Sequence, residues 1–402
     1  MNSKTKLQLS SMMFLEFFIW GGWFVTMGTF LSQSFNASGS QLATAYETQS
    51  IGAIIAPFII GLIADRYFSA QKILGFLHLV GALLLYLAGS SNSFISFYPF
   101  ILMYMILYMP TLALVNSVAF RQMKDPSKEF PPIRVFGTVG WIIAGLIIGY
   151  LGWESQKLLE NTFYVTASAS LILGIFSFTL PNTPPTADKG DYSISKILGL
   201  DALSLLKDKK YLIFFISSIL ICIPLAFYYQ HANQFLNEIG MKAAASKMIL
   251  GQISEVLFLL LLPLFIKRYG IKNALILGIL AWGVRYLLFA FGDTGEQTWM
   301  LLFGIILHGV CYDFFFVSGQ IYTDFKAGET YKSTAQGLIT LATYGVGMLI
   351  GFRFAGWLTD QYITDLGHLW KEIWIQPAIF SFVVLILFLI FFKNETIKIK
   401  SL

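Results

Sequence analysis

Long apolar runs separated by short polar stretches alternate along almost the whole chain. Each run has the roughly 20 residues that an α-helix needs to cross a lipid bilayer. The runs occupy residues 7–31, 41–64, 70–89, 94–120, 131–151, 162–180, 211–236, 243–266, 271–291, 298–323, 333–358 and 373–392. The pattern therefore predicts twelve membrane-spanning helices.

One longer hydrophilic stretch interrupts this pattern between the sixth and the seventh run. Residues 181–210 carry three prolines and five lysines, a composition that indicates a loop rather than a spanning helix. We therefore expect an all-α membrane protein in three parts. These are an N-terminal six-helix half (residues 1–180), a linker loop (residues 181–210) and a C-terminal six-helix half (residues 211–402).

The composition also indicates a multi-pass membrane protein. Of the 402 residues, 56% are hydrophobic and only 12% are charged, which is too apolar for a soluble globular domain. The net charge of +5 comes mainly from lysines and arginines between the runs, so the expected surroundings are a lipid bilayer and not a nucleic acid. The two cysteines lie inside apolar runs and predict neither a disulfide framework nor a metal site.

Lysine and arginine are distributed unequally between alternate loops. Twenty of the 27 lie at the termini or in loops predicted on the same side as the termini, and four lie in the opposite loops. The remaining three, Arg134, Arg285 and Arg353, lie inside apolar runs. Because positively charged loops stay in the cytoplasm, we expect both termini and the 181–210 loop to be cytoplasmic.

Arg134 opens the run 131–151 and needs an explanation. An ionisable residue inside a spanning helix usually faces a partner or a wet cavity, because burying it in lipid is costly. Thr138 and Trp141 follow at the fourth and seventh positions, so all three share one helix face. The alternative is that Arg134, close to Lys128, only extends its guanidinium to the cytoplasmic interface.

Two further runs carry carboxylates. Gln252 and Glu255 lie three residues apart on one face of a helix and could bind a polar ligand or form a structural pair. Asp313 follows His308 and Tyr312 in the run 298–323. Removal from water disfavours a charged aspartate, which suits a group that gains and loses a proton during transport. The alternative is an Asp313 that stays paired or protonated, with His308 as a core residue.

Aromatic and amide side chains interrupt the run 211–236. Tyr229 and Gln230 could stack on and hydrogen-bond a planar substrate, although core or lipid contact is the alternative for any single aromatic residue. The chain has no GxSxG elbow, phosphate-binding loop, CxxC pair or HExxH motif. Transport therefore fits better than enzyme catalysis, and we expect no resident cofactor or metal.

The two halves resemble each other at matching loops. The loop after the second run reads GLIADRYFSAQK (residues 61–72), and the loop after the eighth run reads LFIKRYGIKNA (residues 264–274). Two six-helix halves of this kind resemble the major facilitator transporters. Gly61, Asp65 and Arg66 look like the loop motif of that superfamily, in which the Asp-Arg pair helps to latch the cytoplasmic side.

Several motifs in one collinear order closely resemble those of the bacterial nucleoside:proton symporters. They are FPPIRVFGTVGW, LYMPTLALVNSVAF, GQISEVLF, RYGIKNALI, CYDFFFVSG and TAQGL. The resemblance implies uptake of nucleosides with protons across the bacterial inner membrane by alternating access, and we expect a monomer. The binding and coupling positions it implies are Arg134, Thr138, Trp141, Gln252, Glu255, Tyr312 and Asp313.

The resemblance is weakest in the run 211–236, where family members carry amides at the positions of Ala226 and Tyr229. His308 likewise replaces an aromatic residue. We retain Tyr229, Gln230 and His308 as expected substrate contacts, and both Asp313 and Glu255 as expected proton-coupling groups. A symporter for sugars or polyols on the same fold and a non-transporting nutrient sensor remain the alternative functions.

Overall fold

The computed structural model describes residues 2–59, 67–185, 200–393 and 395. These residues are almost entirely helical and fall into two compact units, each of which is described by itself. The first unit is Met1–Ser193 with Lys242–Ser246, and the second is Ile194–Met241 with Lys247–Leu402.

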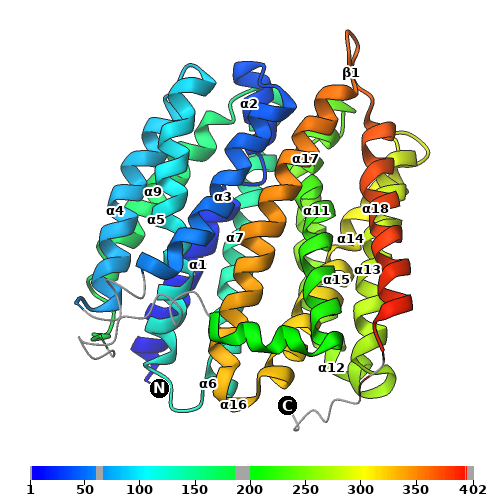
Figure 1. Cartoon of the computed structure of the whole chain (residues 1–402). Helices are drawn as coiled ribbons and strands as arrows, with labels where there is room; N and C mark the ends of the chain where they lie inside the picture. The colour runs from blue at the N-terminus through cyan, green and yellow to red at the C-terminus, as the bar shows by residue number, and fades with distance from the viewer. Residues whose placement is uncertain (1, 60–66, 186–199, 394, 396–402) are drawn as a thin grey trace. The chain divides into compact units, whose positions relative to one another are not determined.

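The first unit is built from long helices joined by short turns. Its elements are α1 (Ser3–Gly21), α2 (Met27–Phe35), α3 (Gly39–Ile59), α4 (Ala70–Gly89), α5 (Phe94–Phe120), α6 (Pro126–Glu129), α7 (Pro131–Leu151), α8 (Trp153–Gln156) and α9 (Glu160–Ser177). Helix α4 packs between α5 and α9, and α1 packs against both α7 and α9 (Figure 1). Glycine allows the α1–α7 contact, since a Cβ at Gly140 would collide with the Phe14 carbonyl oxygen.

The first predicted span is not one helix, so the prediction of a continuous helix over 7–31 is wrong. Helix α1 ends at Gly21 and α2 begins at Met27, with turns between them. The paired glycines lower helix propensity at the break. They also make room for neighbouring helices, since a Cβ at Gly21 would lie 2.7 Å from the Trp141 ring.

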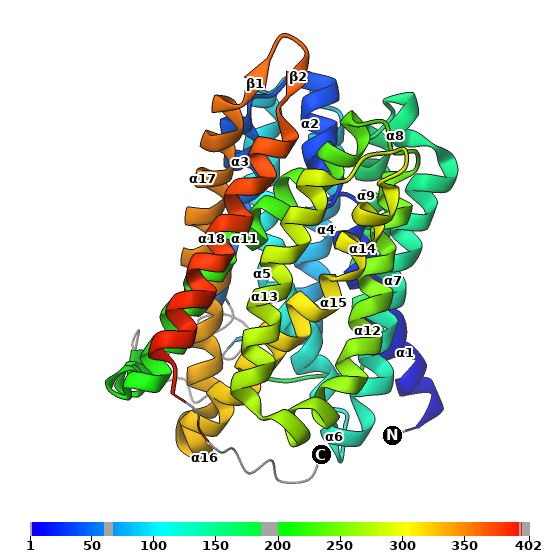
Figure 2. The ribbon, with the colours of Figure 1, turned by 90° about the vertical axis from the view of Figure 1, so that its right-hand side faces the viewer.

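The second unit carries the remaining long helices and one short hairpin. Its elements are η2 (Leu200–Lys207), α11 (Lys209–Glu238), most of α12 (Ala244–Tyr269), α13 (Ile271–Phe291), α14 (Thr298–Ile306), α15 (His308–Cys311), η3 (Tyr312–Val317), α16 (Ser318–Thr340), η4 (Leu341–Gly347), α17 (Met348–Gln361), β1 (Ile363–Thr364), β2 (Gly367–His368) and α18 (Trp370–Phe391). Helix α13 packs against α15 and α18, as Figure 2 shows.

Two segments of the second unit leave ordinary α-helical geometry. Both η3 and η4 are π-helical, and they interrupt the runs that the sequence predicts as spans 298–323 and 333–358. Such segments are rare and are frequently found at functional sites. Gly328, with φ of 59° and ψ of −167°, breaks α16 between the two runs.

Nine helices among the described residues are long and apolar enough to cross a membrane. The other three predicted runs also form helices. The run 7–31 is divided into α1 and α2, α3 is described only as far as Ile59, and α9 has 18 residues with a polar first turn. The expected latch residues Gly61, Asp65 and Arg66 lie outside the described residues.

Candidate functional site

In the first unit, the predicted face of α7 turns towards α1. The guanidinium of Arg134 lies over the Phe17 ring, 4.0 Å from its centroid, and Trp141 meets Trp20 edge-on with ring centroids 5.6 Å apart. Arg134, Thr138 and Trp141 are all half-buried. The structure therefore brings Arg134 and Trp141 against the aromatic face of α1, as the helical spacing predicts.

A buried polar network lies deeper in the same unit, where α1, α4, α5 and α9 meet. Glu16 is fully buried, and its Oε2 lies 2.8 Å from His78 Nε2. Thr111 donates to Glu16 Oε1 at 2.6 Å, and the Tyr108 hydroxyl donates to the Glu16 carbonyl oxygen. On the other side of the imidazole, Ser170 Oγ lies 3.1 Å from His78 Nδ1. Both carboxylate oxygens and both imidazole nitrogens therefore have partners.

In the second unit, aromatic rings from three elements form a column beside Glu255. His308 of α15 stacks with Tyr228 and with Tyr312, whose ring centroids lie 5.4 Å and 6.0 Å away. Its Nε2 lies 3.6 Å from Glu255 Oε2, and Glu255 is half-buried. Tyr229 is half-buried next to Tyr228 on α11. The column thus offers flat apolar faces and hydroxyl, imidazole and carboxylate groups.

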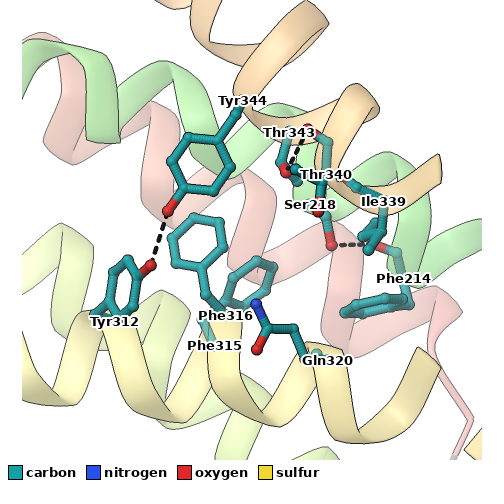
Figure 3. A pocket seen from close by; sticks show the side chains of 11 residues that line it. Phe214, Ser218, Tyr312, Phe315, Phe316, Gln320, Ile339, Thr340, Thr343 and Tyr344 are labelled. Carbon is teal, nitrogen blue, oxygen red and sulfur yellow. Dashed lines mark hydrogen bonds between the residues drawn. The ribbon is translucent and has the colours of Figure 1, made fainter. Parts of the chain in front are cut away.

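Tyr312 also joins the two π-helical segments. Its hydroxyl lies 2.7 Å from the hydroxyl of Tyr344 in η4 (Figure 3). Next to this pair is a small cavity of about 30 Å³, lined by residues from α11, η3, α16 and η4, with Gln320 and Phe316 on one side and Ser218 on the other. A cavity of this size can hold water but not a nucleoside.

Asp313 differs from every other buried carboxylate described above. Its side chain is 1% exposed, and neither oxygen has a hydrogen-bond partner within the part of the chain that the structure describes. It lies on η3, which α13 approaches closely because Gly278 has no side chain to hold the backbone of Phe315 away. An ionised carboxylate there has no donor to stabilise it, which is costly in a buried position.

Two predicted substrate contacts, Gln252 and Gln230, and two residues that were not predicted remain to be described. Gln252 is half-buried one turn before Glu255, and Gln230 is buried in α11. Sequence reasoning assigned no contact to Arg285, which touches Tyr228 and His308, or to Tyr344, which touches Tyr312. An arginine inside an apolar run was a usable signal for Arg285. No sequence pattern distinguishes Tyr344 from the many other aromatic residues of the chain.

Comparisons with known proteins agree along the whole chain. The model of a family described as nucleoside H+ symporter matches residues 3–397. The putative nucleoside transporter YegT of Escherichia coli (strain K12) is 44% identical, covering 99% of this chain and 96% of the relative. The nucleoside permease NupG of the same organism is 33% identical, with 98% of both chains covered. A crystal structure of the nucleoside transporter NupG superposes with a TM-score of 0.89 at 33% identity, over 98% of this chain and 100% of that chain.

Proposed function

The chain belongs to the nucleoside H+ symporter family of multi-pass membrane transporters and has the major facilitator fold, and we propose that it brings nucleosides into a bacterial cell together with protons. The transport cycle is alternating access, in which the binding site opens to one side of the membrane at a time. The energy source is the proton gradient, and the protein is not an enzyme.

The observation that carries this proposal is the family match over residues 3–397, at 33–44% identity to transporters named for nucleosides. The geometry within each unit supports it. Aromatic faces next to polar groups suit a nucleoside, which has a planar base and a ribose with several hydroxyls. A buried carboxylate without a partner suits a group that takes up and releases a proton.

The residues of the site follow from the two groups of side chains described above. We assign substrate binding to Arg134, Thr138, Trp141, Tyr229, Gln230, Gln252, Glu255, His308 and Tyr312. Proton coupling is assigned to Asp313, with Glu255 as the second carboxylate. Gly61, Asp65 and Arg66 are assigned to a conformational latch on sequence grounds.

The orientation is assigned on the distribution of positive charge. Both termini and the 181–210 loop are cytoplasmic in this proposal, because twenty of the 27 lysines and arginines fall on that side. Cysteines introduced at the exposed Ser38 and Ser204 test it in intact cells. An impermeant thiol reagent should modify the Ser38 variant and not the Ser204 variant, and the reverse result contradicts the orientation. We also propose a monomer, which light scattering of the purified protein would check.

The substrate class is tested by binding to the purified protein. We expect uridine and adenosine to bind, and free uracil, ribose and a disaccharide to bind far more weakly. Stronger binding of the disaccharide than of uridine would support the sugar symporter instead. Binding of nucleoside without any uptake by proteoliposomes would support a sensor.

Arg134 gives the sharpest test of the site itself. Arg134→Lys keeps the charge but loses the planar fork of donors, so we expect nucleoside affinity to fall by on the order of tenfold or more. Titration calorimetry with uridine measures this loss. Wild-type affinity in a well-folded Arg134→Lys protein would mean that Arg134 is only an interfacial anchor.

A further inference from the structure

Arg285 is a buried cation with no role in the site assigned above. It lies on α13 with a fully buried side chain, and its Cζ is 3.5 Å from the centroid of the Tyr228 ring. Trp282 and Phe289 surround the guanidinium at 5.4 Å and 5.6 Å. Within the described ranges no carboxylate pairs with it, and its Nε and Nη2 have no hydrogen-bond partner. Such an expensive arrangement calls for a functional explanation.

Arg285 makes a hydrogen bond to His308, one of the residues assigned to substrate binding. Its Nη1 lies 3.3 Å from Nδ1 of His308. A guanidinium can only donate, so Nδ1 must accept and must carry the ring's lone pair. The hydrogen of the neutral imidazole is therefore on Nε2. Arg285 thus selects one of the two tautomers of His308.

The selected tautomer directs its N–H group at Glu255. His308 Nε2 lies 3.6 Å from Glu255 Oε2, slightly beyond hydrogen-bond distance. Two glycines allow α12 and α15 to approach this closely. A Cβ at Gly309 would lie 2.6 Å from the Ser254 carbonyl group, and Gly251 lies against the His308 side chain. The Gly309 N–H also donates to Ser254 Oγ at 3.0 Å. The opposite tautomer would turn a lone pair towards the carboxylate.

We propose that Arg285 is a positioning residue of the transport site: it holds His308 as the Nε2–H tautomer, so that the imidazole donates towards Glu255 and orients this carboxylate for the substrate. The inference rests on the proposed function of Glu255 as a substrate contact. Arg285 itself touches no substrate in this account. Its Nε and Nη2 groups stay among the rings of Tyr228, Trp282 and Phe289.

Four described groups of the second unit face His308. Arg285 reaches it from α13 and Glu255 from α12, while Tyr228 and Tyr312 stack on it from α11 and η3. Arg285 is the cation among these groups. Its removal therefore takes away the donor to Nδ1.

The tautomer can be read directly by nuclear magnetic resonance with ¹⁵N-labelled histidine in the full-length protein. The chain has four histidines, and the spectrum of His308→Gln identifies the His308 signals. We expect wild-type His308 to show a protonated Nε2 and an unprotonated Nδ1 from pH 6 to pH 8. In Arg285→Gln the signals should shift to a mixture of the two tautomers. A wild-type His308 protonated at Nδ1, or unchanged signals in Arg285→Gln, would overturn the proposal.

Uridine binding supplies the functional readout. Arg285→Gln should weaken uridine binding by on the order of tenfold. Arg285→Lys, which keeps a cationic donor, should restore most of the affinity and should serve if Arg285→Gln does not fold. Arg353→Gln is the matched control, because Arg353 lies in an apolar run but is exposed on α17, and this variant should match the wild type.

The outcomes separate this inference from the proposed function. A wild-type protein that binds no uridine contradicts the proposed function, while its His308 signals still report the tautomer. A wild type that binds uridine and an Arg285→Gln variant that binds it with the same affinity leave the proposed function standing and refute the role of Arg285.

Discussion

Glu16 in the first unit and Asp313 in the second are both acidic residues buried in apolar helices, with exposed fractions of 0% and 1%. Their surroundings differ completely. Glu16 Oε1 accepts from Thr111, and its Oε2 is paired with His78. Asp313 has no hydrogen-bond partner for either oxygen among the described residues. The two carboxylates are thus equally buried, but only that of Glu16 has hydrogen-bond partners among the described residues.

This difference separates two uses of a carboxylate in a membrane protein. A buried polar group that is fully hydrogen-bonded strengthens packing, and removing its partner is destabilising. A buried carboxylate without donors contributes no such stabilisation. A charge or hydrogen-bond donor that enters the site can therefore change its protonation state without breaking existing hydrogen bonds. We therefore interpret Glu16 as structural and Asp313 as the group that carries the coupling proton.

The largest expected effect is on stability. Glu16→Ala leaves His78 and Thr111 without their buried acceptor, so we expect a loss of about 3–5 kcal/mol in the free energy of unfolding. Asp313→Asn, which breaks no described hydrogen bond, should change it by about 1 kcal/mol or less. Chemical unfolding in detergent measures both. A similar loss of unfolding free energy in the two variants would contradict the interpretation of Glu16 as structural and Asp313 as the proton carrier.

Glu255 lies between these extremes, since it is half-buried and has an imidazole 3.6 Å away. We expect Glu255→Gln to weaken uridine binding by on the order of tenfold, because the amide is a poorer acceptor than the carboxylate. Any remaining uptake should keep its pH dependence, which uptake assays between pH 5.5 and pH 8 would show. If that pH dependence were lost, Glu255 rather than Asp313 would be assigned as the residue that carries the coupling proton.

The smallest expected effect concerns Asp208, a partly exposed carboxylate outside the spanning helices. Burial opposes ionisation, but hydrogen bonds from Lys326 and from the first turn of α11 hold the pKa of Asp208 below its ordinary value. A lowered pKa means a contribution that is present at neutral pH and is lost as the pH falls below about 4. Asp208→Asn should therefore cost about 1 kcal/mol or less at pH 7. A loss that grows as the pH falls would contradict this sign.

Much of the fold was predictable because the bilayer imposes a simple pattern. A run of about 20 apolar residues is a strong signal, and each predicted run contains a helix among the described residues. The break after Gly21 was not predicted, because it involves the packing of Trp141 against Gly21 and of Thr166 against Gly22. The π-helical segments at Tyr312 and Leu341 were also missed, since hydrophobicity does not distinguish them from α-helix.

The sequence indicated candidate residues for the site but not the contacts between them. Ionisable groups in apolar runs indicated Glu255 and Asp313, because such residues are rare there, whereas Arg285 was noted in an apolar run but not assigned to the site. Nothing in the sequence indicates that Arg285 pairs with His308, or that Glu16 is satisfied while Asp313 is not. Those contacts depend on which helices pack together. The hydrophobic periodicity within one helix does not indicate its neighbours.

The central claim is that Asp313 carries the proton that drives accumulation, and one experiment with proteoliposomes tests it most directly. One proton entering with a neutral nucleoside supplies about 2.3 kcal/mol per 100 mV, enough for a roughly 40-fold concentration ratio. We expect wild-type protein to concentrate labelled uridine inside and to acidify the lumen as it does so. Asp313→Asn should still exchange uridine across the membrane but should reach only equal concentrations, with no acidification. Uridine accumulation and acidification at the wild-type level in Asp313→Asn would contradict the account.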